Sequence, residues 1–203
     1  IIVVNDGSTD NSLSIVNNYN KAGRVTILTK ENGGPASARN FGLMHCHPDS
    51  KWVTFIDSDD YVEPSFLSQL TSLDGDLKMC MPFPKYGEWK DRIAKDDDII
   101  QFKNLSSSKE FASIFKCGTM CPFWNKLFSL DIIHNNNLSI PDIRLLEDAD
   151  FVFRYIQYCD TVSWKNSHIY NYIHRPGSET SKIGEDMLVN YIRPHKDMTE
   201  WFA

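Results

Sequence analysis

Two carboxylates, Asp57 and Asp59, follow the apolar run Trp52–Ile56 and are two positions apart. If a strand extends through them, both side chains leave the same side of it, where they repel each other unless a cation joins them. Ligands gather beyond the carboxyl ends of strands in open α/β sheets, and paired carboxylates there suit Mg²⁺ or Mn²⁺ bridging a nucleotide diphosphate. The alternatives are an acidic loop and a calcium site. An EF-hand loop is disfavoured, because its sixth and twelfth positions would be Val62 and Ser68 rather than Gly and Glu.

A third acid, Asp6, stands where another apolar run, Ile1–Val4, gives way to the sequence Asn5-Asp6-Gly7-Ser8. The simplest interpretation is a turn that uses the glycine, followed by a helix that uses the serine as its cap. Because Asp6 lies at the carboxyl end of the predicted strand, its carboxylate is also placed to accept a hydrogen bond from a nucleobase imide. These residues alone leave both interpretations open.

The elements that must position these acids alternate between strand and helix over the first part of the chain. Apolar runs predict strands at 1–4, 25–28, 52–56 and 77–81, with helices after Ser8, over 36–44 and from Pro64. This alternation is typical of a parallel α/β sheet. Residues 84–108 are less regular, around a short predicted strand at 99–102. A helix is predicted over 147–158, followed by strands over 161–164 and 169–173.

Composition limits the class of protein. The 203 residues are 41% hydrophobic and 24% charged, which predicts one compact domain. The formal charge of −6 and the pI near 5.5 argue against a general nucleic-acid surface. No apolar run is long enough to span a membrane. The five cysteines lack C-x-x-C spacing, so neither a disulfide framework nor a zinc site is indicated, and a reducing cytosol fits best.

Four separated motifs occur in an order that resembles the family 2 glycosyltransferases of the GT-A fold: IIVVNDGSTDNS, ENGGPASARNFGL, FIDSDDYVEP and LLEDADFVF. The match covers most of residues 1–175. The resemblance implies one α/β domain with a Rossmann-like, mostly parallel central sheet and helices on both faces. Residues 1–83 would form the half that binds the nucleotide-sugar, 84–175 the less regular acceptor half, and 176–203 a C-terminal loop and helix. A further strand is expected before Ile1, because relatives carry one there.

The same resemblance assigns roles at the donor side. Asp6 matches the aspartate that reads uracil, while Arg39 and Asn40 match residues close to the nucleotide and diphosphate. For Arg39, a solvated helix face is the plain alternative. Asp57 matches the residue near the ribose and the metal, and Asp59 the direct ligand of Mn²⁺ or Mg²⁺. Ser58 between them belongs to the same donor-binding set, and Asp60 would lie just behind it.

At the acceptor side, the resemblance makes Asp148 the general base and Glu147 its acidic neighbour at the opening of a helix. Acidic capping of that helix is the plain alternative for Glu147. Trp124, in the sequence Trp124-Asn125-Lys126, matches a residue that forms a floor under the sugar or acceptor. A tryptophan packed in the hydrophobic core is an equally good interpretation. His174 and Arg175 follow the last predicted strand, where relatives carry cations that compensate the leaving diphosphate.

These observations lead to one function and two rivals. The expected function is inverting, metal-dependent transfer from a nucleotide-sugar, most simply a UDP-sugar, to a glycan or lipid-linked glycan acceptor in bacterial surface-polysaccharide synthesis. The protein is expected in the cytoplasm, where segments outside this sequence would hold it at the inner face of the membrane. No nucleic-acid partner is expected. The rivals are a sugar-phosphate nucleotidyltransferase, whose Gly-rich, basic signature is absent here, and a non-catalytic carbohydrate-binding remnant.

Overall fold

The computed structural model describes residues 1–20, 23–80, 98–109, 111–112, 120–143, 146–173 and 200–201. The predicted boundary at 83/84, the cations His174 and Arg175, and nearly all of the predicted C-terminal helix lie outside these residues. Within the described ranges, no helix combines the length and the apolar character that crossing a bilayer requires.

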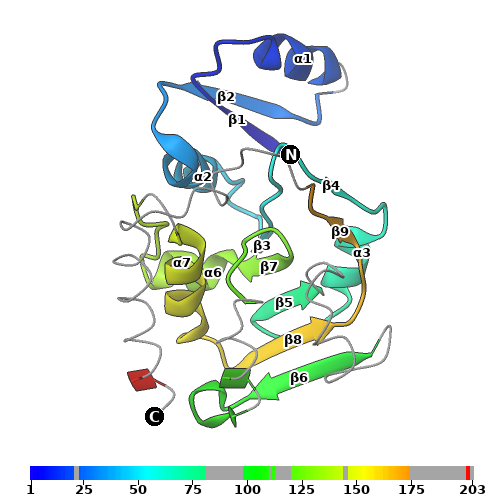
Figure 1. Cartoon of the computed structure of the whole chain (residues 1–203), viewed down its shortest axis with the longest axis vertical. Helices are drawn as coiled ribbons and strands as arrows, with labels where there is room; N and C mark the ends of the chain where they lie inside the picture. Colours follow the sequence, from blue (N-terminus) through cyan, green and yellow to red (C-terminus); the bar gives the residue numbers. More distant parts are fainter. Residues whose placement is uncertain are drawn as a thin grey trace.

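The N-terminal residues form a small α/β unit. Strand β1 (Ile2–Asp6) pairs in parallel with β2 (Thr26–Lys30), so Asp6 and Lys30 end neighbouring strands in the same register. Helix α1 (Ser12–Tyr19) connects the two strands, and α2 (Gly34–Met44) follows β2 with Pro35 in its first turn. Figure 1 shows α1, β1 and β2 at one end of the molecule, with α2 between them and the larger body. This unit confirms the strand and helix alternation predicted there.

The larger body is built on a five-stranded sheet in the order β3-β7-β5-β8-β6. Its strands are β3 (Trp52–Val53), β5 (Leu77–Cys80), β6 (Ile99–Lys103), β7 (Lys126–Ser129) and β8 (Thr161–Lys165). Strand β4 (Tyr61–Val62) pairs separately with β9 (Tyr170–Asn171). The two predicted halves of the chain therefore contribute strands to one sheet.

The expectation of a mostly parallel sheet is wrong, although the α/β class is confirmed. Among the described strands, only β1/β2 and β5/β8 pair in parallel, while β3/β7, β5/β7, β6/β8 and β4/β9 are antiparallel. The difference comes from β7, which enters the sheet between β3 and β5 in the direction opposite to both, and from β6, which runs opposite to β8.

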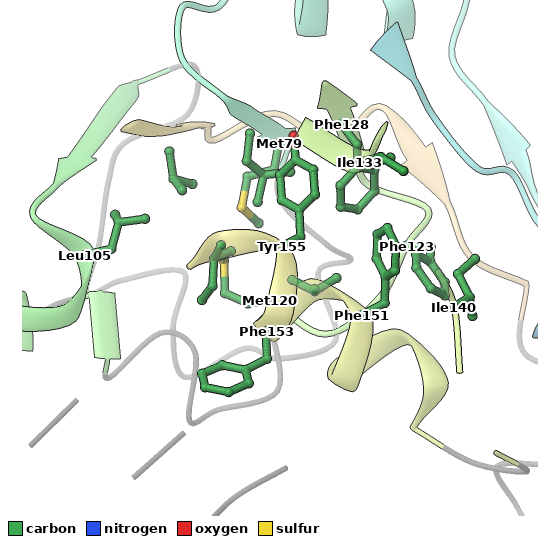
Figure 2. Packing of buried hydrophobic residues seen from close by; sticks show 14 of the residues in the cluster. Met79, Leu105, Met120, Phe123, Phe128, Ile133, Ile140, Phe151, Phe153 and Tyr155 are labelled. Carbon is green, nitrogen blue, oxygen red and sulfur yellow. The ribbon is translucent and has the colours of Figure 1, made fainter. Parts of the chain in front are cut away.

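Helices cover both faces of this sheet, as predicted. On one face, α6 (Leu130–Asn135) and α7 (Glu147–Ile156) pack against alternate residues of β5, β7 and β8. Figure 2 shows Phe151 and Tyr155 of α7 directed at Phe128 of β7, and the ring centroids of Phe128 and Tyr155 are 5.0 Å apart. On the other face, α3 (Phe66–Thr71) packs against Cys80, Leu127 and the β9 region. The core thus fixes α7, whose first turn carries the two acids predicted to act on the acceptor.

The acidic pair after β3 is not part of a strand. Pairing with β7 ends at Val53, and the amide of Asp60 donates to the carbonyl of Asp57, which closes a turn over 57–60. The alternation argument for Asp57 and Asp59 is therefore wrong, because the strand ends at Val53, before both residues. The two carboxylates lie in this turn instead: Asp57 is its first residue and is half-buried, and Asp59 is its third residue and is exposed.

Candidate functional site

Arg39 joins two motifs that the sequence keeps far apart. Its Nη2 donates to Oδ1 of Asp57 at 2.8 Å, and its Nη1 donates to Oε1 of Glu147 at 2.9 Å. The guanidinium carbon also lies 5.0 Å from the centre of the Phe123 ring. Although burial disfavours its charge, the two carboxylates raise the pKa of Arg39 above its usual value. The side chain is only 20% exposed, so the solvated helix face considered above is wrong.

Tyr170 fixes the acidic turn from the other side. Its hydroxyl donates to Oδ2 of Asp60 at 2.6 Å and accepts a hydrogen bond from the amide of Asp57 at 3.2 Å. Oδ1 of Asp60 accepts from the amide of Ile173, so this carboxylate ties the turn to the end of β9. Asp60 thus holds the turn in place, and its predicted position behind a metal-binding pair stays a prediction. Tyr170 was not foreseen, since nothing in its sequence neighbourhood relates it to a residue more than a hundred positions earlier.

Asp148 occupies the first turn of α7, after Leu146, whose φ of 66° sets the chain direction into the helix. Its Oδ1 accepts a hydrogen bond from the amide of Ala149 at 2.7 Å. The residue keeps some contact with solvent, but protein surrounds most of the carboxyl group. This burial, with the neighbouring charge of Glu147, raises the pKa of Asp148 to about 6. A carboxyl group poised near neutral pH at the edge of a site has the properties of a general base.

Asp6 holds the loop that leads into α2. Its carboxylate accepts hydrogen bonds from Nζ of Lys30 at 2.7 Å and from the amide of Gly34 at 2.8 Å, and Gly33 also donates to it. Burial raises the pKa of Asp6, but these hydrogen bonds outweigh it and the net pKa is lowered. Lys30 was not singled out from the sequence, although two parallel strands of equal length place residues 6 and 30 side by side.

Asn40 makes a two-point contact with a backbone. Its Nδ2 donates to the carbonyl of Ile140 at 2.7 Å, and its Oδ1 accepts from the amide of Ile140 at 2.9 Å. This contact links α2 to the segment before α7. One residue earlier in α2, the ion pair of Arg39 with Glu147 links α2 to the first residue of α7. The geometry favours a structural role for Asn40, and its predicted place beside the nucleotide stays a prediction.

Trp124 belongs to an aromatic stack at the edge of the hydrophobic cluster beneath α3. Its ring lies 4.5 Å from that of Tyr170 and 5.7 Å from that of Tyr172, and both pairs are tilted by only 21°. The indole is half-buried, so it is neither a full core residue nor an open platform. Because Tyr170 binds the acidic turn, this stack places Trp124 next to the site that Asp57 belongs to.

A divalent cation fits this site only as a partner of a substrate. Within the described part of the chain, no three His, Cys, Asp or Glu side chains are grouped so that they could hold a metal by themselves. Mg²⁺ is commonly bound by one or two carboxylates together with substrate phosphates. Asp57, at the start of the turn, and the exposed Asp59, two residues later within it, are oxygen donors of the required kind.

The chain matches the family model described as Glycosyl transferase family 2 over residues 1–131. It is 31% identical over 178 residues to "Putative glycosyltransferase EpsH" of Bacillus subtilis (strain 168), covering 85% of this chain and 51% of the relative. It is 25% identical over 198 residues to the poly(ribitol-phosphate) beta-glucosyltransferase of Bacillus spizizenii, covering 96% and 29%. The chain spans about half the length of the first of these relatives.

Among solved structures, the chain is similar to Staphylococcus aureus TarS 1–349 in complex with UDP-GlcNAc. The TM-score is 0.69 at 22% sequence identity, and the match covers 90% of this chain and 52% of the TarS chain. At this identity the similarity establishes the fold, which is the GT-A fold expected from the motifs.

Proposed function

Because the chain belongs to glycosyl transferase family 2, we propose that it carries out inverting transfer of a sugar from a UDP-sugar to a glycan hydroxyl group. The observation that carries this proposal is the double ion pair of Arg39. It brings Asp57, from the acidic turn, and Glu147, beside the candidate base, to one guanidinium. A donor phosphate site and an acceptor site that must exchange one sugar have to lie this close together.

Asp57 and Asp59 are the residues that would hold Mn²⁺ or Mg²⁺. When bound, the cation would offset the negative charge that the diphosphate leaving group gains. Arg39 has a complementary role. The carboxylates of Asp57 and Glu147 already balance its positive charge, and this charge keeps the two carboxylates from repelling each other. Ser58, in the same turn, is exposed and remains in the proposed donor-binding set.

In the transfer step, Asp148 accepts the proton of the acceptor hydroxyl group. The oxygen forms a bond to the anomeric carbon, while the bond from that carbon to the diphosphate oxygen breaks and its electron pair leaves with UDP. A single displacement of this kind inverts the configuration at the anomeric carbon. With its pKa near 6, Asp148 is mainly ionised at pH 7 and still basic enough to take a proton as the hydroxyl group reacts.

Glu147 has a different role, because it anchors the start of α7. Its carboxylate is bound by Arg39 at 2.9 Å, so it holds the start of α7 against α2 rather than facing an acceptor. Asp6, with its network to the loop before α2, is proposed to shape the uracil site, and Trp124 to border the sugar or acceptor. His174 and Arg175 remain proposed cations for the diphosphate.

The relatives suggest the class of substrate. The name of one relative specifies a poly(ribitol-phosphate) acceptor, and the similar structure contains UDP-GlcNAc. We therefore propose a UDP-hexose or UDP-N-acetylhexosamine donor and a cell-surface polymer, such as a polyol phosphate or a capsular glycan, as acceptor.

The test compares Asp148→Asn with Glu147→Gln in the complete gene product. Release of UDP from UDP-glucose, UDP-galactose and UDP-GlcNAc is measured with Mn²⁺, and UDP affinity is measured by calorimetry. Asp148→Asn is expected to lower turnover by about 10²- to 10⁴-fold without changing UDP affinity, because only the proton acceptor is lost. Glu147→Gln is expected to have a smaller effect, since its amide oxygen can still accept from Arg39.

Two outcomes would contradict the proposal. Near wild-type turnover of Asp148→Asn would move the base to another residue. No release of UDP from any donor by the wild-type protein, despite UDP binding, would favour the non-catalytic carbohydrate-binding alternative.

A further inference from the structure

Both ends of the acidic turn are bound to a single hydroxyl group, that of Tyr170 in β9. Because an amide N–H can only donate, the hydroxyl oxygen accepts from the amide of Asp57, at 3.2 Å, and its own proton is left for Asp60. That proton is donated to Oδ2 of Asp60 at 2.6 Å. The turn begins at Asp57 and ends at Asp60, so one group connects its two ends, with Asp59 between them.

The ring of Tyr170 is itself held by aromatic neighbours. It stacks on Trp124, with the ring centroids 4.5 Å apart, and its centroid lies 6.1 Å from that of Phe66 in α3. The residue is 2% exposed. Side chains in a close-packed interior shift little, so the hydroxyl group is a fixed point to which the turn is bound.

The two ends of the turn are supported unequally. After Asp60 the chain enters β4, which pairs with β9. Before Asp57, in contrast, strand β3 has already ended at Val53. The hydrogen bond to Tyr170 therefore matters most at the Asp57 end, where it holds the backbone that follows β3.

We propose that Tyr170 is a positioning residue of the donor site, whose hydroxyl group holds Asp57 and Asp59 in place for a divalent cation that binds together with the donor diphosphate. The inference rests on the proposed function in so far as these two acids hold the cation. It gives a task to a residue that lies outside the four motifs of the sequence.

The size of the expected effect follows from the small number of ligands. Among the side chains that the structure describes, no three of His, Cys, Asp or Glu form a group that could hold a metal. A cation would rely on a few carboxylates and on substrate phosphates, so its affinity depends on how often the turn is correctly formed. If loss of the charge-assisted bond to Asp60 leaves the turn formed about one-tenth of the time, the dissociation constant rises about tenfold.

The first experiment uses Tyr170→Phe, which removes the hydroxyl group and keeps the ring that stacks on Trp124. Calorimetry measures UDP binding to the complete gene product with Mn²⁺ and with EDTA. With Mn²⁺ the dissociation constant of UDP is expected to rise about tenfold, while with EDTA it changes by less than about twofold. An unchanged constant with Mn²⁺ would overturn the inference and leave the proposed metal role of the turn intact. If Mn²⁺ does not tighten UDP binding to the wild-type protein, that metal role fails as well, so the two failures are distinguishable.

Tyr155→Phe is the matched control. The hydroxyl group of Tyr155 in α7 also accepts from a backbone amide, that of Ser129, and donates to the carbonyl of Asp76, both at 2.7 Å. Its ring is fully buried as well. Both variants should therefore lower the urea midpoint, but only Tyr170→Phe should weaken the effect of Mn²⁺ on UDP affinity. An equal weakening in both variants would contradict a specific role for Tyr170.

The second experiment measures UDP release from a saturating UDP-sugar as Mn²⁺ is varied. In Tyr170→Phe the half-saturating concentration of Mn²⁺ is expected to rise about tenfold, and excess Mn²⁺ should recover the turnover lost at limiting Mn²⁺. A general structural defect would lower turnover at every Mn²⁺ concentration. That result, with an unchanged half-saturating concentration, would overturn the inference.

A measurement on the wild-type protein requires no variant. The amide of Ile173 donates to Oδ1 of Asp60, so its hydrogen exchange follows the opening of the turn on the side that faces β9. A ligand that binds only the formed turn slows this opening, by about tenfold when its concentration is ten times its dissociation constant. UDP with Mn²⁺ is expected to slow exchange at Ile173 by this factor, and UDP with EDTA to slow it much less. Equal rates under the two conditions would overturn the inference independently.

Discussion

Replacing Arg39 with methionine removes the link between the acidic turn and α7 while keeping the length and apolar part of the side chain. The change leaves Asp57 and Glu147 without their shared cation, with side chains that are 28% and 14% exposed. Breaking a fully buried pair costs about 3–5 kcal/mol, and an exposed pair contributes about 0.2–1 kcal/mol. Partial exposure places Arg39→Met between these limits, and we expect a loss of about 2–3 kcal/mol in the free energy of unfolding.

Urea denaturation followed by circular dichroism measures this loss, and Arg154→Met is the control. Arg154 pairs with Asp150 one helical turn earlier in α7, and both side chains are about one-third exposed. Single pairs of this kind on a helix contribute about 0.3–0.5 kcal/mol, so this variant should lose much less stability. Equal losses in the two variants would refute the view that Arg39 joins two parts of the fold.

A double-mutant cycle separates the two arms of Arg39. Combining Arg39→Met with Glu147→Gln should give less than the sum of the single losses, by about 1–2 kcal/mol, because each change alone removes the ion pair between the two side chains. Strict additivity would mean that the Glu147 arm contributes nothing, despite its distance of 2.9 Å.

Asn40→Ala should lower the unfolding free energy by about 1–3 kcal/mol, because both backbone groups of Ile140 lose their partner; calorimetry should show unchanged UDP affinity, and a large loss would restore a direct nucleotide role. Asp59→Ala should abolish Mn²⁺-dependent UDP binding while the urea midpoint stays in place, and retained binding would exclude Asp59 as a metal ligand. Asp148→Asn should be more stable than wild type by about 3 kcal/mol at pH 7 but not at pH 4, since the raised pKa of Asp148 makes wild type lose stability as pH rises through about 4 to 6; an equal difference at both pH values would contradict this.

Local chemistry made several elements predictable. The β-branched run before Asp6 gave a strand because such residues suit a pleated, buried surface, and the helix predicted over 36–44 is present as α2, which begins two residues earlier at Gly34. The start of α7 at Glu147 was also predicted, with its acids in the first turn, where the helix dipole favours them. In each case the determining interactions lie within a few residues.

Pairing across the sheet was not predictable in this way. The direction of β7 and the end of its pairing with β3 at Val53 involve strands that lie far apart in the sequence. The same holds for the contact of Tyr170 with the acidic turn. The sequence neighbourhood of each residue carries no trace of its partner, because the order of the strands brings the two together.

The separate β1/β2 sheet has a consequence for how the protein opens. All residues of β1 are only partly buried, whereas all residues of β5 are fully buried. The β1/β2 unit meets the larger body through α2, whose Gly42 packs against Val4 while Arg39 and Asn40 hold the other side. Amide hydrogens of β1 should therefore exchange through a local opening of lower free energy than those of β5. In such an opening α2 acts as the hinge, so a ligand that bridges Asp6 and Asp57 would slow exchange in β1 without touching most of its residues.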